Sequence, residues 1–196
     1  MPEHFRFSVK VPRALTHEGE LTAEPAVLDQ FIDEIAGLGP KLAVLLVQLP
    51  PKLECNVTSA QRFFKELHRR VDGRVHVRIA CEPRHPSWGS ETADRLLADL
   101  GVSRVAADPP LWPGANEPGG DATFVYFRWH GQPRKYYSDY GKECLAQLER
   151  QLKITRASEA WAIFDNTAHG FATSNAVAVT DAVTASATVA ALDHAK

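Results

Sequence analysis

Hydrophobic and polar residues alternate in several short segments, each of which stops at a proline, a glycine or a charged residue. Residues 5–10, 75–82 and 123–130 follow this alternation, which is typical of strands with one buried face. Residues 41–49 form a nearly continuous apolar run that ends at Pro50 and Pro51, as expected of a strand buried on both faces. Shorter strands are predicted at residues 102–108 and 160–165.

Between these strands, apolar residues recur at the spacing of a helix face. This spacing predicts helices at residues 27–36, 58–70, 91–100 and 144–152, and a helix of small residues from about residue 173. Residues 109–121 contain many prolines and glycines around Trp112, and they are expected to form an irregular connection with Gly119 and Gly120 in a turn. The alternation of strands and helices predicts a parallel α/β protein.

A polar residue closes nearly every predicted strand. A TIM-barrel-like (β/α) barrel explains this regularity, because it brings all strand ends to one mouth, whereas an open doubly wound sheet would scatter them. The strand-closing residues are Lys10, Gln48, Glu82, Asp108, His130 and Asp165.

The densest group of polar residues follows the strand at residues 75–82. Glu82, Arg84 and His85 stand together there, between Pro83 and Pro86, which end the strand because proline donates no ladder hydrogen bond. This stretch is therefore the first candidate for a site.

Composition and charge restrict the class of protein. The chain has 196 residues, of which 44% are hydrophobic and 23% are charged, as in an ordinary globular protein of one domain or at most two. The formal net charge of -2 gives no support for a general nucleic-acid surface. Cys55, Cys81 and Cys144 have no CxxC spacing, which favours reduced thiols. No targeting or membrane-spanning segment is recognisable, so we expect a cytoplasmic protein.

Several separate motifs resemble one known family. FRFSVKVPR…TH, LVQLPP, EPRHPSW, YFRWHG, YYSDY and FDNT…NA occur in the order and spacing of the YecE-like family, a domain of unknown function (72), over roughly residues 5–177. The resemblance implies a TIM-barrel-like fold and no particular reaction. We therefore expect a partial barrel over residues 1–180 and a tail over residues 181–196.

The sequence departs from the family in two ways. Members usually begin with about two further βα units, so the resemblance implies an incomplete, N-terminally truncated barrel. Strands 5–10 and 160–165 would then be unpaired edges, open to another chain or to self-association. The second departure is Asp165, where the family more often has Asn.

The strand ends suggest binding and acid–base chemistry. Guanidinium groups match carboxylates and phosphates, and imidazole titrates near neutral pH, so a small anionic molecule is the expected partner. The candidate catalytic residues are Glu82, His85, Asp108 and His130. The expected ligand-binding residues are Lys10, Gln48, Arg84, Arg128, Tyr137, Asp165 and Asn166. The alternative for the cations is that they pair with the acidic residues and have only a structural role.

The sequence is also compatible with other functions. Oxygen and nitrogen ligands at the strand ends make a divalent metal a rival proposal, although no HExxH-like spacing supports it, and the cofactor is left unknown. The main hypothesis is a hydrolase or isomerase with a histidine or carboxylate base. The alternatives are a non-catalytic module that binds nucleic acid or protein through a basic and aromatic rim, and a truncated barrel without activity.

Overall fold

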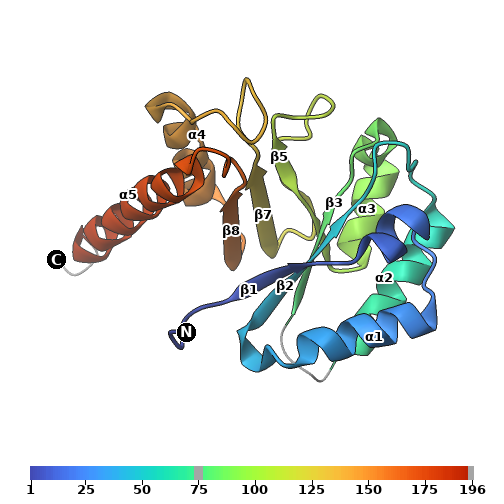
Figure 1. The fold of residues 1–196 in the computed structure, drawn as a ribbon. Helices are drawn as coiled ribbons and strands as arrows, with labels where there is room; N and C mark the ends of the chain where they lie inside the picture. Colours follow the sequence, from blue (N-terminus) through green and yellow to red (C-terminus); the bar gives the residue numbers. More distant parts are fainter. Residues whose placement is uncertain (73–76, 194–196) are drawn as a thin grey trace.

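The strands form two sheets that lie next to each other (Figure 1). The structure, a computed structural model, describes residues 1–72 and 77–193, with side chains described through residue 185. The first sheet has the order β1-β2-β3-β4-β6 and the second the order β5-β7-β8. The first comprises β1 (Phe7–Lys10), β2 (Leu42–Gln48), β3 (Arg78–Glu82), β4 (Val102–Arg104) and β6 (Gly119–Gly120). The second comprises β5 (Ala106–Asp108), β7 (Phe124–Trp129) and β8 (Glu159–Phe164). All strand pairs are parallel except β4 with β6.

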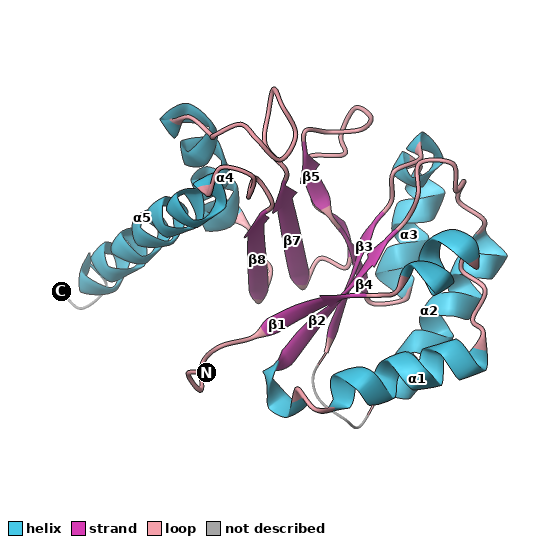
Figure 2. Ribbon diagram, in the orientation of Figure 1, coloured by secondary structure: helices cyan, strands magenta, loops and turns pink. Residues whose placement is uncertain are grey.

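Helices cover the outer face of each sheet (Figure 2). The helices α1 (Pro25–Ala36), α2 (Val57–Val71) and α3 (Glu91–Asp99) pack on the first sheet, and α4 (Lys142–Ile154) and α5 (Phe171–Asp193) pack on the second. The short helical turns are η1 (Ala14–Glu18), η2 (Gly39–Lys41) and η3 (Pro86–Gly89). Asn56 caps α2 by accepting from Ser59 N at 3.0 Å, and Ser90 caps α3 by accepting from Ala93 N at 3.2 Å.

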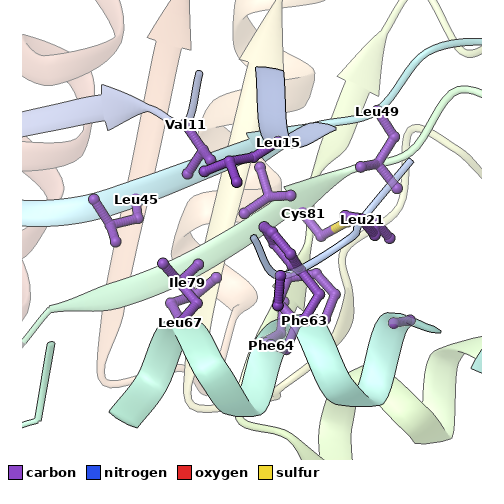
Figure 3. Close-up of a cluster of buried hydrophobic side chains, with 14 of the residues drawn as sticks. Val11, Leu15, Leu21, Leu45, Leu49, Phe63, Phe64, Leu67, Ile79 and Cys81 are labelled. Carbon is purple, nitrogen blue, oxygen red and sulfur yellow. The ribbon is translucent and has the colours of Figure 1, made fainter. Parts of the chain in front are cut away.

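Alternation along each central strand divides its side chains between two environments. In β2, Leu45 and Val47 join the cluster under the helices, whereas Val44 and Leu46 point to the inner face. The same holds in β3, where Ile79 and Cys81 face the helices and Ala80 faces inward. Figure 3 shows the outer cluster, in which Phe63, Phe64 and Leu67 of α2 meet Leu45 and Ile79 of the sheet.

The inner faces of the two sheets share one apolar layer. Val44, Leu46 and Ala80 of the first sheet contact Phe124 and Tyr126 of the second, together with Val105 between them. Because side chains alternate, the next inward positions along these strands fall at their carboxyl ends. That is where the polar residues lie.

The structure bears out the α/β class and changes several details. The strand predicted at residues 102–108 is wrong as a single unit, because the chain passes from one sheet to the other at Val105. Gly119 and Gly120, expected in a turn, pair with β4. The strand predicted from residue 75 begins at Arg78, and residues 75–76 lie outside the described residues. The helix α5 continues across residue 181, where the expected tail begins.

Closure into a barrel is not found among the described strands. The strand β1 lies at one end of its sheet and β8 at one end of the other, as expected for two edges. The described strands therefore form a mixed α/β fold with two mainly parallel sheets.

Burial predicts the cost of truncating the core. Phe63 has no exposed surface and lies under the first sheet, so Phe63→Ala should lower the free energy of unfolding by about 3–5 kcal/mol. Val57, on the same helix and 43% exposed, provides a control, because Val57→Ala should change it by less than about 1 kcal/mol. Urea unfolding followed by circular dichroism measures both. Equal losses would contradict the assigned core.

Candidate functional site

Five polar side chains meet at the carboxyl ends of the central strands. Gln48 and Glu82 end β2 and β3, and they are Cα partners in the register of the two strands. Arg128 and His130 come from β7 and the residue after it, and Asp165 follows β8. Each lies two or four residues beyond a residue of the inner apolar layer on the same chain segment, so the alternation that forms the core also builds this cluster.

Arg128 connects the strands of the two sheets. Its Nη1 donates to Gln48 Oε1 at 2.7 Å and to Glu82 Oε2 at 2.5 Å. Its Nη2 donates to Asp165 Oδ2 at 3.0 Å. The guanidinium is thereby fixed by three partners from three different strands.

His130 lies between the same two carboxylates. Its Nδ1 is 3.0 Å from Asp165 Oδ2, and its Nε2 is 3.3 Å from Glu82 Oε1. Carboxylate oxygens accept hydrogen bonds, and imidazole carries a hydrogen on both nitrogens only when it is protonated. Both contacts are hydrogen bonds at the same time only in the imidazolium form.

The two carboxylates of the cluster are held in their ionised form. Burial by itself would raise the pKa of Glu82, but the hydrogen bond with His130 and the charge of Arg128 outweigh it and lower the pKa to about 2. Burial likewise opposes ionisation of Asp165, and His130 and Arg128 again lower its pKa. The side chains differ in access, since Glu82 is 2% exposed and Asp165 is 29% exposed.

A cavity of about 360 Å³ opens beside Arg128 between the inner faces of β1, β2, β7 and β8. Its charged lining residues are Arg6, Lys10 and Arg128, and no carboxylate lines it. Its other lining residues are Ser8 and the apolar or aromatic residues Phe7, Leu46, Tyr126, Trp161 and Ile163. Tyr126 and Trp161 stack with an interplanar angle of 9° and a centroid distance of 6.4 Å, and Ser8 Oγ lies 2.9 Å from Tyr126 Oη.

Two other predicted residues lie beside the cluster rather than within it. Arg84 Nη2 donates to Glu82 Oε1 at 3.3 Å from the far side of that carboxylate. His85 instead caps η3, because its Nδ1 accepts from Ser87 N at 3.3 Å and lies 2.8 Å from Ser87 Oγ. No contact joins His85 to His130 in the described part of the chain. A catalytic role for His85 therefore stays a prediction that this geometry does not favour.

Asp108 belongs to a separate buried network. Its Oδ1 accepts from Tyr140 Oη at 2.8 Å, and the same hydroxyl accepts from Gly131 N at 2.8 Å. Burial raises the pKa of Asp108 even though Tyr140 opposes the shift, and burial also raises the pKa of Tyr140. The backbone oxygen of Asp108 accepts from His130 N at 2.7 Å. Asp108 thus fixes the loop after β7, and among the described contacts no hydrogen bond joins its side chain to the His130 ring.

Asn166 and Tyr137 also hold the loops around the site. Asn166 is fully buried, and its Nδ2 donates to Ser138 O at 3.0 Å and to Asn175 Oδ1 at 2.9 Å. Tyr137 lies on the rim, where the Arg134 guanidinium is 4.0 Å from its ring centroid. Direct binding by either residue stays a prediction.

Some residues of the cavity were not singled out from the sequence. Tyr126 shares a face of its strand with Arg128 and His130, because these residues are spaced two apart. The strand pattern was therefore enough to place Tyr126 beside the site. Trp161 is likewise two residues from Ile163 and four from Asp165. Ser8 gave no signal, because its importance comes from a contact with Tyr126, which is 118 positions away.

Across residues 1–72 and 77–193, no three His, Cys, Asp or Glu side chains are grouped as ligands for a metal ion. Cys55, Cys81 and Cys144 are free thiols. None of the helices described here is both long enough and apolar enough to cross a membrane.

Comparison with known proteins identifies the relatives of the chain. A family model described as "Protein of unknown function DUF72" matches residues 1–195, which confirms the family resemblance of the sequence. A DUF72 family protein from Thermotoga maritima has a TM-score of 0.75 and 24% identity over 92% of this chain and 74% of its own. Two structures of a DUF72 family protein from Enterococcus faecalis have TM-scores of 0.74 and 0.73, each at 23% identity, and cover 93% and 94% of this chain and 76% and 80% of their own. No curated protein matches the sequence.

The pKa of Glu82 predicts how stability depends on pH. The folded-state pKa of about 2 is below the ordinary value of 4.5, so the ionised form stabilises the fold above about pH 4.5 and this stabilisation is lost as the pH falls toward 2. Glu82→Gln should lower the free energy of unfolding by on the order of 3 kcal/mol at pH 7 and by much less near pH 2. Urea unfolding between these pH values measures the difference.

The exposed Glu117 supplies the control, because Glu117→Gln removes the same charge outside the cluster. It should leave the free energy of unfolding within about 0.5 kcal/mol of the original at every pH. A Glu82→Gln effect that is independent of pH would show that the carboxylate is not ionised in the folded protein.

Proposed function

Since this chain belongs to the DUF72 family of proteins of unknown function, we propose a function from its own residues: it binds a small organic anion in the cavity beside Arg128. The ligand places its carboxylate or phosphate on the guanidinium and its apolar body against Trp161 and Tyr126. The proposal includes the barrel-like arrangement expected from the sequence, with β1 and β8 on either side of an opening.

One observation carries this proposal, namely the set of charges around the cavity. Arg6, Lys10 and Arg128 line it without a carboxylate among the lining residues. Glu82 and Asp165 do bind Arg128, but from outside this cavity. An anion that enters the cavity therefore meets cations and aromatic surface, and no negative side chain from the lining repels it.

The hydrogen bonds of Arg128 leave donors for such a ligand. A guanidinium has five N–H donors. Gln48 and Glu82 use both hydrogens of Nη1, and Asp165 uses one of Nη2. Among the described contacts, the hydrogen on Nε and the second one on Nη2 have no acceptor. Donors of this kind are what a carboxylate or phosphate needs to bind a guanidinium.

Proton transfer fits the cluster beside this cavity. Asp165 is the more exposed carboxylate of the cluster, and its lowered pKa keeps it ionised at neutral pH. His130 and Glu82 are almost completely buried, so we assign them a positioning role behind Asp165 and Arg128. Asp165 does not line the cavity but shares Arg128 with it, so a hydrolase or isomerase reaction with Asp165 as the base requires a substrate that extends past Arg128 toward that carboxylate.

A rim that binds nucleic acid receives less support. Arg134 covers one face of the Tyr137 ring, and the His169 ring contacts Tyr137 edge to face at 5.5 Å. The ring is thus engaged within the chain rather than presented for stacking on a base.

Trp161 provides a direct test of the proposed cavity. Benzoate and phenyl phosphate should change the intrinsic fluorescence on binding, whereas the neutral benzamide should not, and Trp161→Phe should abolish the change. Lys10→Ala should weaken the binding roughly fivefold or more, because it removes one of the cations that line the cavity.

Lys142→Ala is the matched control, since Lys142 is exposed at the start of α4. It should leave the dissociation constant within about a factor of two. The proposal fails if none of these anions binds, or if Lys10→Ala and Lys142→Ala have the same effect.

A further inference from the structure

A second cavity, of about 600 Å³, lies near the carboxyl ends of β1, β2 and β3. It is separate from the cavity beside Arg128, and the two have no lining residue in common. Two prolines, Pro50 and Pro51, form part of its wall. Its charged or titratable lining residues are Arg13, His17, Glu18, Glu20, Lys52 and Arg84.

The two arginines of this cavity have unused hydrogen-bond donors. Arg13 is exposed, and no ion pair or hydrogen bond of its side chain occurs among the described contacts. Arg84 binds Glu82 through Nη2, but its Nε is buried and has no partner in the described part of the chain. A buried donor without an acceptor is costly, and the guanidinium that carries this donor lines the cavity.

His17 is oriented by the hydrogen bonds of Thr16. The Thr16 hydroxyl donates to Pro12 O at 3.2 Å, so its oxygen accepts from His17 Nδ1 at 2.8 Å. In the neutral ring this leaves Nε2 without a hydrogen. His17 can therefore take up one further proton at Nε2 when the surroundings favour a positive charge.

The charges around His17 are mainly positive. Burial lowers its pKa first, and Arg13, Arg84 and Lys10 lower it further, whereas Glu18 alone raises it. The other carboxylate of the cavity, Glu20, is 3.9 Å from Lys52, and both side chains are largely exposed, so this ion pair contributes little. The positive potential that disfavours protonated His17 is the potential that attracts an anion.

We propose that this cavity is a binding site for a tetrahedral oxyanion, a phosphate or phosphate monoester, held by Arg13, His17 and Arg84. Donors that reach the cavity from different chain segments suit a group with several oxygen atoms in a tetrahedron better than a planar carboxylate. The bound dianion offsets the arginine charges, and His17 then takes a proton at Nε2 and donates it as a hydrogen bond to the ligand. The proposal goes beyond the binding of an organic anion beside Arg128 and does not depend on it.

Titration calorimetry with inorganic phosphate and with sulfate tests the site. Both anions should bind, and Arg13→Gln and His17→Asn should each weaken the binding roughly fivefold or more. Arg62→Gln, which removes an exposed arginine of α2 far from this cavity in the sequence, is the control and should have no measurable effect. Circular dichroism confirms that each variant is folded.

Sulfate separates the role of His17 from the titration of the ligand, because sulfate keeps its charge across neutral pH whereas phosphate does not. Sulfate affinity should rise as the pH is lowered from about 8 to about 5.5, and His17→Asn should remove most of this rise. The NMR signal of the His17 ring should titrate at higher pH when sulfate is bound.

Three results would overturn the proposal: no binding of either anion, equal affinities for Arg13→Gln and Arg62→Gln, or a His17 titration that sulfate does not move. The benzoate titration of Trp161 fluorescence distinguishes the two sites. Arg13→Gln should leave that titration unchanged, so either site can fail without the other.

Discussion

The structure depends on the buried carboxylate of Glu82 and on the side chains that pair with its charge. A carboxylate that is 2% exposed is stable only when it is paired, and Glu82 is paired with Arg128 and His130 at the end of β7 and with Arg84, two residues further along its own chain segment. Arg128 also donates to Gln48 and Asp165, so one guanidinium joins the ends of β2, β3 and β8. Removing one partner would leave the others buried without compensation, which costs more than the pair contributes.

The pairing works because the inner faces of the sheets are layered. Below the ions, Val44, Leu46 and Ala80 contact Phe124 and Tyr126 and form a buried apolar layer. Charges above such a layer interact in a medium less polar than water, which strengthens each contact and raises the cost of an unpaired group. The same alternation of side chains therefore accounts for both the core and the site.

The sequence was sufficient to predict the family, the α/β class and most of the cluster. Alternation along residues 124–130 placed Arg128 and His130 on one face, and the rule that parallel strands end together placed Gln48, Glu82 and Asp165 near them. The sequence was not sufficient to predict which side chains form hydrogen bonds with one another. His85 and Asp108 have the same residue types as His130 and Asp165 and also lie at strand ends. Their side chains nevertheless form hydrogen bonds with Ser87 and Tyr140 and not with the cluster. The passage of the chain between the sheets at Val105 was also missed, because residues 102–108 contain no proline or glycine that would mark a change of sheet.

The passage of the chain between the sheets at Val105 has a mechanical consequence. One residue joins β4 to β5, so the covalent link there holds these two strands of different sheets close together. The contacts of Arg128 with Gln48 and Glu82 join the sheets a second time, at the strand ends. A single substitution at Arg128 therefore removes a connection between the sheets that the covalent link at Val105 does not replace.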